Sequence, residues 1–283
     1  MPSHRQSHRS RPSASFDEYG PGPHELGQNL LVDSKIVDRI VHALDGRDLP
    51  VVEWAAGRGA ITRRLALLGR PVEAVEIDRR SVTHLRRTLG AHVAVTHGDI
   101  LRHAPPTRAY DLVSNVPFHI TTPLLRRLLS LPGWQPAVLI TQWEVARKRA
   151  GVGGTTLLTA QWWPWYMFAL DGRIPASSFA PRPSVDAGLL IVDRRPSPFV
   201  PIAQRSAYQL FVKRVFGGPG RGVPDVLVRA GIGASAVRQW ARRHDVDSGT
   251  LPRDLDARAW ITAYGMMDND AHRSRRLPSR QRW

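Results

Sequence analysis

The sequence predicts a doubly wound α/β domain with a Rossmann-like sheet, followed by a small all-helical C-terminal domain. Three observations support this prediction. Short apolar runs alternate with amphipathic helical segments from residue 34 to about residue 150. The apolar runs are continuous, as in parallel strands that are buried on both faces. After Arg195 the pattern changes to helical segments separated by glycine-rich and Asp/Ser/Gly turns.

The predicted sheet has one strand for each apolar run. Strands are expected at residues 51–55, 72–78, 93–100, 110–118, 137–143, 161–170 and 187–192. Asp33 or Ser34 can cap the first helix, and further helices are expected at residues 61–69, 81–90 and 122–131 and around 146–149. The last two strands have no long helix between them, so they are expected to close the sheet as a terminal antiparallel hairpin.

The domain boundaries follow from changes in composition. Residues 25–195 are expected to form the α/β domain, and residues 196–268 the helical one, with helices at 202–216, 223–231, 234–244 and 256–264. Residues 1–24 are rich in Ser, Arg, His, Pro and Gly and predict a disordered tail. Residues 269–283 predict a basic disordered tail that serves solubility or makes loose phosphate contacts.

Composition restricts the partners and the chemistry. The net charge of +16 indicates a polyanionic partner, either nucleic acid or an acidic membrane face. Only three basic residues are lysines; the arginines suit bidentate phosphate contacts, although codon bias would produce the same excess. The absence of cysteine excludes disulfides, thiol nucleophiles and thiolate metal sites. The eleven histidines show no metal-ligand spacing, and no apolar run is long enough for a membrane helix, so we expect a soluble, cytoplasmic protein without a metal.

Three motifs at the ends of predicted strands suit a nucleoside cofactor. EWAAGRG (53–59) places two glycines between a strand and a helix, where the backbone can approach a ligand closely. Glu76 ends the next strand, about 20 residues beyond the glycine turn, and can accept hydrogen bonds from ribose hydroxyls. Asp99 follows the third strand and can accept from an adenine amino group. Each motif taken alone also has a structural explanation without a ligand: a tight turn for EWAAGRG, a solvated acid for Glu76 and a helix cap for Asp99.

The stretch SNVPF (114–118) follows the fourth strand, at the rim where open α/β sheets bind ligands. An exocyclic amine of a nucleobase is a poor nucleophile because its lone pair is delocalised into the ring. The side-chain oxygen of Asn115 and a backbone carbonyl beside Pro117 can accept its two N–H bonds and orient it toward an electrophile. Phe118 can stack on an extruded base. A plain strand-to-helix turn is the alternative.

Taken together, these motifs resemble the rRNA adenine N6-methyltransferases, the group of the dimethyladenosine transferases and the macrolide-resistance methylases. The resemblance spans residues 26–265 and follows the family's order. It includes GQNLL (27–31), EWAAGRG (53–59), VEID (75–78), GDI (98–100), NVPF (115–118) and FAPRPSVDA (179–187). QWEVARKRAG (142–151), with WPW (163–165), is most similar to the antibiotic-resistance branch of actinomycetes.

The resemblance implies the cofactor S-adenosylmethionine. Gln28 and Asn29 would close over it, with the glycine turn beside its methionine part, Glu76 at its ribose and Asp99 at its adenine. The implied cofactor-binding residues are Gln28, Asn29, Leu30, Glu53, Gly57, Gly59, Glu76, Ile77, Asp99, Ile100 and Asn115. Three positions depart from the family pattern. Ala55 replaces a glycine and Ala56 a residue that is often proline, which can change the shape of the cofactor pocket, and Phe118 replaces a tyrosine.

The resemblance also implies the acceptor and its contacts. The catalytic residues would be Asn115, Pro117, Phe118 and Phe179, with the two phenylalanines on either side of a flipped adenine. Arg126, Arg147 and Lys148 would contact RNA, and the helical domain would help to grip it. The expected substrate is an adenine in the peptidyl-transferase loop of 23S rRNA, methylated by a monomeric, membrane-free enzyme that confers macrolide resistance.

Four alternatives remain at this point. A housekeeping enzyme that dimethylates 16S rRNA has the same fold and chemistry. An adenine-N6 DNA methyltransferase fits the NVPF motif, but the short helical domain and FAPRPSV favour RNA. A non-catalytic nucleic-acid-binding protein fits the charge but not the intact Asn115 and Phe118. A nicotinamide-dependent dehydrogenase lacks support, since the glycine loop does not match G-x-G-x-x-G.

Overall fold

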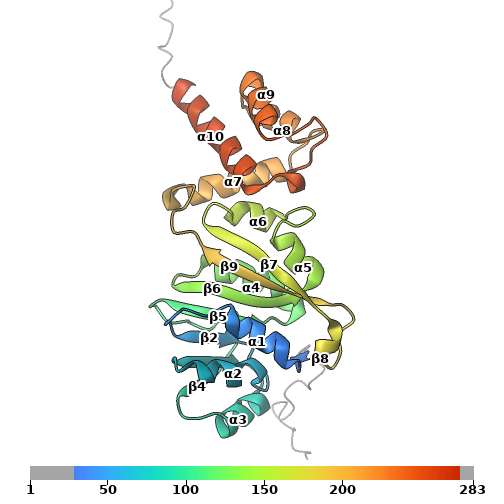
Figure 1. Ribbon diagram of the computed structural model, residues 1–283. Helices are drawn as coiled ribbons and strands as arrows, with labels where there is room; N and C mark the ends of the chain where they lie inside the picture. Colours follow the sequence, from blue (N-terminus) through green and yellow to red (C-terminus); the bar gives the residue numbers. More distant parts are fainter. Residues whose placement is uncertain (1–28, 275–283) are drawn as a thin grey trace, which may run out of the picture.

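The computed structural model describes residues 29–274, with side chains described as far as Met267 (Figure 1). The predicted N-terminal tail, Gln28 and residues 275–283 of the predicted C-terminal tail lie outside the described residues. Among the described residues, no helix has the length and the apolar character needed to span a bilayer.

A seven-stranded mixed sheet forms the centre of the α/β region. Its first five strands run parallel, and the last two pair antiparallel. Across the sheet the order is β4 (Val93–His97), β3 (Val72–Glu76), β2 (Val51–Trp54), β5 (Tyr110–Asn115), β6 (Trp134–Gln142), β9 (Ala187–Arg194) and β7 (Tyr166–Ile174). The doubly wound sheet with a terminal antiparallel hairpin is therefore confirmed.

Helices cover both faces of the sheet, and each face has its own hydrophobic cluster. One cluster packs α1 (Ser34–His42), α2 (Ala60–Leu65) and α3 (Arg79–Thr88) against the strands. The other buries four leucines of α4 (Thr121–Ser130) and Ala146 of α5 (Trp143–Arg149). Asp33 is the N-cap of α1, because its carboxylate accepts a hydrogen bond from the Lys35 amide at 3.0 Å.

Three elements differ from the sequence prediction. The strand expected at 161–170 begins at Tyr166, because residues Leu157–Trp162 form α6, whose N-cap Thr156 accepts from the Thr159 amide. A second, two-stranded sheet pairs β1 (Leu30–Leu31) with β8 (Phe179–Ala180) across the chain, and no local pattern signals such a pairing. The last helix, α10 (Ala257–Ser274), continues past the boundary expected at residue 268.

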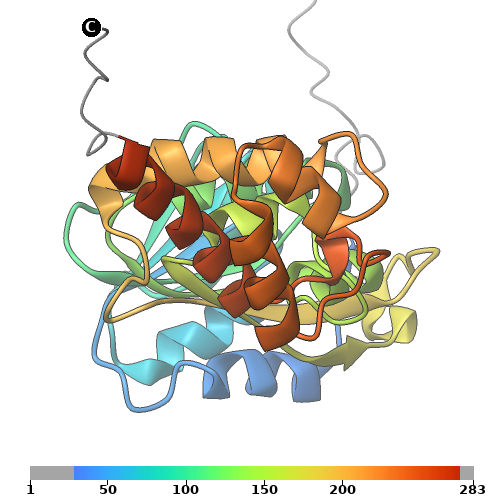
Figure 2. The same cartoon turned by 90° about the horizontal axis from the view of Figure 1, so that it is seen from above.

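The helical region consists of α7 (Arg205–Phe216), α8 (Val223–Arg229), α9 (Ala234–Arg243) and α10. These helices lie at one end of the molecule, over the side of the sheet where α6 packs (Figures 1 and 2).

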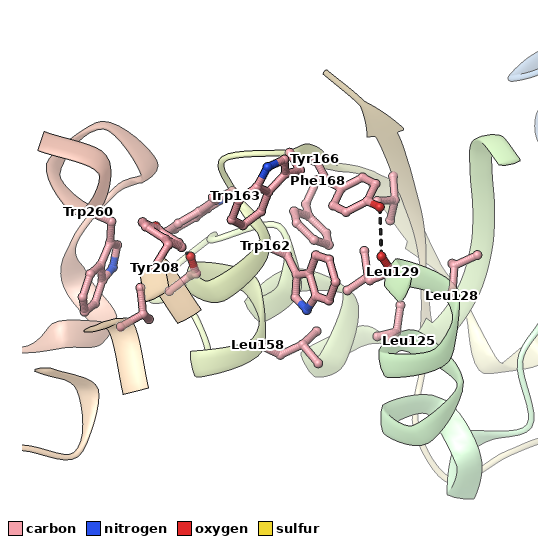
Figure 3. Packing of buried hydrophobic residues seen from close by; sticks show 14 of the residues in the cluster. Leu125, Leu128, Leu129, Leu158, Trp162, Trp163, Tyr166, Phe168, Tyr208 and Trp260 are labelled. Atoms are coloured by element: carbon pink, nitrogen blue, oxygen red, sulfur yellow. Dashed lines mark hydrogen bonds between the residues drawn. The ribbon is translucent and has the colours of Figure 1, made fainter. Parts of the chain in front are cut away.

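The helical region shares its hydrophobic core with the α/β region. Tyr208 of α7 donates a hydrogen bond to the Ala160 carbonyl of α6 at 3.0 Å, and its ring meets Trp165 edge-on. Trp260 of α10 lies in the same cluster as Trp162 of α6 (Figure 3). The three tryptophans at 162, 163 and 165 are all at most 8% exposed, so they pack in the core. The boundary at residue 195 is thus a change of architecture within one continuous core.

Truncating Trp260 to alanine tests this shared core. The side chain is fully buried, so we expect the free energy of unfolding to fall by about 3–5 kcal/mol. Because the core is continuous, fluorescence and circular dichroism should report the same single transition in urea. Leu210→Ala, at a 58% exposed position of α7, is the control and should have little effect. Two separate transitions, with only one shifted by the mutation, would show that the helices fold independently.

Candidate active site

A cavity of about 270 Å³ opens at the carboxyl ends of the parallel strands. Its walls come from the segments that follow β2, β3, β4 and β5, together with the start of β1. The lining residues are Asn29, Leu30, Ala55, Gly57, Glu76, Ile77, Asp99, Ile100, Leu101, Asn115, Val116, Pro117, Phe118, His119 and Ile120. The cavity therefore brings together the NVPF stretch and most of the residues predicted to bind the cofactor; Glu53 and Gly59 do not line it.

Asn115 is held at the rim by a contact that the sequence does not show. Its Nδ2 donates to the Asn29 carbonyl at 2.8 Å, which connects the end of β5 to the segment before β1. The amide has only one oxygen, so Oδ1 remains the acceptor of this side chain. The other acceptor expected for an amine was a backbone carbonyl beside Pro117. The Pro117 carbonyl already accepts from the Ile120 amide at 3.0 Å, so the neighbouring Val116 carbonyl is the candidate for this role.

Phe118 begins the short 3₁₀ helix η2 (Phe118–Ile120), which leads into α4. The hydroxyl of Thr121 donates to the Phe118 carbonyl at 3.0 Å and so fixes this turn. The ring is partly buried and forms part of the cavity wall. A planar apolar group therefore lies in the same wall as the polar Asn115, which is the arrangement expected for stacking a base while its amine is held.

Glu76 is a buried carboxylate, 2% exposed, at the end of β3. Its Oε1 accepts from the Ile77 and Asp78 amides at 2.9 and 2.8 Å, and its Oε2 accepts from the Gly57 amide at 2.7 Å. These three hydrogen bonds compensate for the loss of water around the charge. A carboxylate offers about four acceptor positions, so roughly one remains for a ligand hydroxyl.

The glycine turn contains two glycines with different roles. Gly57 has φ +54°, and a Cβ there would lie 3.1 Å from a Leu30 methyl, so glycine keeps the cavity open at this point. Gly59 has φ +81°, and a Cβ there would lie 2.6 Å from a Leu85 methyl. Gly59 does not line this cavity or the smaller one beside it that Glu53 lines, and packing against α3 explains the glycine. Its contact with a cofactor stays a prediction.

Ala55 has φ +59°, a left-handed conformation that glycine adopts more easily. It stands where the sequence resemblance expected glycine, and it lines both the main cavity and a neighbouring one. The backbone thus keeps the conformation that a glycine would take, and the added methyl group narrows the pocket.

The third segment carries Asp99, whose Oδ1 accepts from the Leu101 amide at 2.8 Å and caps a turn. Asp99 is partly exposed and lies in the cavity wall. Ile77 is 50% exposed and Ile100 is buried, and both line the cavity. An acceptor next to apolar side chains suits a heteroaromatic ring with an exocyclic amine.

Glu53 lines a second cavity of about 180 Å³, which shares Leu30, Ala55, Gly57 and Asn115 with the first. Its side chain is 1% exposed, and its Oε2 has no hydrogen-bond partner among the described residues. Burial raises the pKa of Glu53 to about 8, and the neighbouring Glu76 carboxylate contributes in the same direction. Glu53 is therefore largely protonated at neutral pH, next to a space that could hold a cationic group.

Besides Gly59 and Glu53, two more residues predicted to hold the cofactor or the base do not line this cavity: Phe179, and Gln28, which lies outside the described residues. Phe179 is 3% exposed, belongs to the hydrophobic cluster of α1–α3 and does not line the cavity. Its place on β8, paired with Leu31, explains why an aromatic residue is suitable there, and its role opposite Phe118 remains a prediction. Gln28 cannot be placed.

The predicted RNA contacts lie on α4 and α5. Arg126 and Lys148 are exposed. Arg147 is engaged within the protein: it donates to Glu144 at 2.8 Å and to the Val152 carbonyl at 3.0 Å. A phosphate contact by Arg147 therefore has to share its guanidinium with these partners. Contact of the three residues with RNA stays a prediction.

Several residues of the cavity wall were not singled out from the sequence. They are Leu101, Val116, His119 and Ile120. Each lies within four residues of a motif that was singled out, so adjacency to the motif was the available signal. The chain turns at each strand end and presents these neighbours to the same space.

Comparison with known proteins agrees with this geometry. Residues 23–268 match the model of the family described as ribosomal RNA adenine dimethylase. The chain belongs to this family. Membership makes it an enzyme that transfers methyl groups from S-adenosylmethionine to adenine in ribosomal RNA, as the sequence resemblance implied.

Individual members of the dimethylase family are similar over most of their length. The mycinamicin-resistance protein MyrB of Micromonospora griseorubida is 48% identical over 90% of this chain and 83% of its own. An rRNA adenine N-6-methyltransferase of Corynebacterium diphtheriae is 45% identical over 75% of this chain and 85% of its own. The crystal structure of the 23S rRNA methyltransferase ErmE superposes with a TM-score of 0.79 at 30% identity, over 85% of this chain and all of that one.

The residues present fit the family's cofactor. Gly57 leaves space where a side chain would intrude, Glu76 keeps an acceptor position in the cavity, and Asp99 faces it beside apolar groups. The unpartnered oxygen of Glu53 in the adjoining cavity suits the ammonium group of a methionine moiety. The groups predicted to bind the nucleoside and the amino-acid part thus line two cavities that share four residues.

The raised pKa of Glu53 predicts a pH-dependent stability. The folded state keeps a proton on Glu53 up to about pH 8, whereas the unfolded chain loses it near pH 4.5. This contribution is fully present below pH 4.5 and is lost as the pH rises toward 8. Between pH 5.5 and 7.5, the free energy of unfolding should therefore fall by about 2–3 kcal/mol more in the wild type than in Glu53→Gln. Urea unfolding of the two cofactor-free proteins at several pH values measures this difference. If the free energy of unfolding changed with pH by the same amount in both proteins, the prediction would be wrong.

Ala55→Gly should stabilise the protein. Relief of the left-handed conformation contributes about 1–2 kcal/mol, and the greater freedom of glycine in the unfolded chain removes part of it. We expect a net gain of about 0.5–1 kcal/mol in urea unfolding. Ala236→Gly, in the ordinary helical backbone of α9, is the matched control, and its free energy of unfolding should fall by a similar amount. If Ala55→Gly also lowered the free energy of unfolding, the packing of the Ala55 methyl group would outweigh the strain.

Proposed function

We propose that this enzyme methylates N6 of one adenine in the peptidyl-transferase loop of 23S rRNA and thereby confers resistance to macrolide-type antibiotics. A methyl group at that position removes a hydrogen-bond donor and adds bulk where such a drug docks. We further propose that it acts as a monomer in the cytoplasm, where its ribosomal substrate is made. The similarity to MyrB and ErmE supports this choice of rRNA.

One observation carries the proposed chemistry: Asn115, Phe118, Glu76 and Asp99 line a single cavity. The first two can hold an adenine by its amine and its face, and the other two can hold a nucleoside cofactor. A cavity with both sets of groups places donor and acceptor next to each other, and this proximity is the main requirement of a transfer between them.

The chain's own residues position the acceptor. Oδ1 of Asn115 and the Val116 carbonyl accept the two N–H groups of the adenine amine, so its lone pair is turned away from the base. When bound, S-adenosylmethionine supplies an electrophilic methyl group on a positively charged sulfur. The bond from Asn115 to the Asn29 carbonyl keeps the amide from rotating, and Pro117 fixes the backbone beside it. The proton that the amine loses goes to solvent, since an amide is too weak a base to keep it.

The RNA is held mainly through its phosphates. Arg126 and Lys148 are exposed on α4 and α5, the helices that follow β5 and β6. Exposed arginine and lysine, in a chain of net charge +16, would attract a polyanion and contact its phosphates.

Transfer of labelled methyl groups to protein-free 23S and 16S rRNA tests the proposal, with primer extension to locate the modified base. A mark in the peptidyl-transferase loop of 23S rRNA supports it, and mass spectrometry of that nucleoside counts the methyl groups. A mark near the 3′ end of 16S rRNA would replace it with the housekeeping reaction. Transfer to neither rRNA would overturn it.

Asn115→Ala should lower kcat at least about 10²-fold, the usual cost of removing one oriented hydrogen-bonding group from a transition state. Binding of rRNA should persist, since phosphate contacts are unaffected. The measurements are single-turnover methyl transfer and a filter-binding titration. Leu67→Ala, at a 72% exposed position that lines neither of the two cavities, is the control. Near-normal turnover in the Asn115 variant would contradict the assigned role.

A further inference from the structure

We propose that a groove beside α5 holds an unpaired RNA base next to the target adenosine, stacked on Trp143 and Arg173, and that this groove contributes to substrate specificity. The proposal rests on the proposed function and adds a second recognition site to it. The groove is open to solvent, has a volume of about 450 Å³ and is separate from the cavity of Asn115.

The groove lies on the same rim of the sheet as the active site. In the register of β5 and β6, Asn115 is paired with Ile140, and the chain reaches Gln142 and Trp143 two and three residues later. The opposite wall comes from the segment 184–186, shortly after the FAPRP stretch, and from Arg173 near the end of β7. An RNA strand with one nucleotide in the active site would pass close to this groove.

The floor of the groove is a stacked pair. The Cζ atom of Arg173 lies 5.3 Å from the centre of the Trp143 ring. Asp186 holds both partners, because its carboxylate pairs with Arg173 Nε at 2.7 Å and its carbonyl accepts from the Trp143 amide at 2.9 Å. Arg173 remains 60% exposed and Trp143 partly exposed, so a planar guanidinium and an indole are both presented to solvent.

Such a pair suits a nucleobase. Bases stack on aromatic rings and on arginine planes, and this contact is not tied to one sequence. Val185, 43% exposed, adds an apolar edge. Gln142, Glu144 and Ser184 supply donors and acceptors along the walls, which could read the edge of a base. A purely apolar partner would leave these polar groups without water or hydrogen bonds.

The charges around the groove favour an anionic partner. The pKa of Glu144 is lowered by Arg147, with further contributions from Lys148 and Arg173. The pKa of Asp186 is lowered first by the Ala176 amide, and also by Arg173 and Arg182. Four cationic side chains therefore surround two carboxylates, and the excess positive charge complements an anionic partner such as RNA rather than a neutral or basic one.

The test compares Trp143→Leu, which removes the aromatic face, with Trp143→Phe, which keeps one. With protein-free 23S rRNA, we expect Trp143→Leu to raise KM for RNA about 5- to 100-fold, the usual effect of losing one base stack. Trp143→Phe should stay within about threefold of the wild type. KM for S-adenosylmethionine and thermal unfolding should not change, which separates a lost contact from a misfolded protein.

Salt dependence gives a second readout. The slope of log KM for RNA against log salt concentration should be the same for Trp143→Leu and the wild type, since stacking releases no counterion. Lys148→Gln should lower that slope by roughly one unit if it contacts a phosphate. A reduced slope in Trp143→Leu would show that the groove acts through phosphates and would overturn the base-stacking assignment.

Abasic substitutions identify the base and keep the proposal testable if Trp143→Leu fails to fold. Each unpaired nucleotide near the target is replaced in turn in a short rRNA fragment. At one position the wild-type KM should rise 5- to 100-fold, and there Arg173→Gln should cause little further loss. If no position behaves in this way, or if Trp143→Leu folds with an unchanged KM for RNA, the proposal is wrong. A 23S methyl mark with an unchanged KM would refute only the groove, whereas the absence of the mark would refute the proposed function.

Discussion

The parallel alignment of β3, β2 and β5 is the constraint on which the site depends. The register pairs Trp54 with Val75 on one side and with Ser114 on the other. The next residues along the three strands are Ala55, Glu76 and Asn115, and all three line the cavity. Ser114 strengthens this alignment, since its hydroxyl donates to the Trp54 carbonyl at 2.8 Å. One row across the sheet thus joins the groups proposed to bind the cofactor to the group proposed to bind the acceptor.

The two buried acidic side chains at this rim are accommodated in different ways. Three backbone amides donate hydrogen bonds to Glu76. Glu53, one strand away, has an oxygen without a partner, and burial favours its protonated form. A binding site tolerates such a group when a ligand can supply the missing partner, whereas in a purely structural core the same group would only reduce stability.

The helical region is continuous with the catalytic one in physical terms. Tyr208, Trp162 and Trp260 belong to one hydrophobic cluster that extends to the sheet (Figure 3). Movement of the helices relative to the active site would expose this aromatic surface, so the two regions present a nearly fixed surface to the RNA. Recognition can then rely on groups held in place beforehand, such as Trp143 and Arg173, and this lowers the entropy cost of binding.

The sequence by itself determined the doubly wound sheet, the terminal hairpin and the segments that form the cavity, because continuous apolar runs and strand-end motifs are local patterns. It also singled out Asn115, Glu76 and Asp99 from their positions at the ends of strands, and the structure places all three in the cavity wall. Only the tertiary structure decided the contacts between segments distant in the chain. The bond from Asn115 to Asn29, the pairing of β1 with β8 that buries Phe179, and the junction through α6 all join such segments. Local propensity carries no information on these contacts, because each depends on which surfaces meet when the whole core packs.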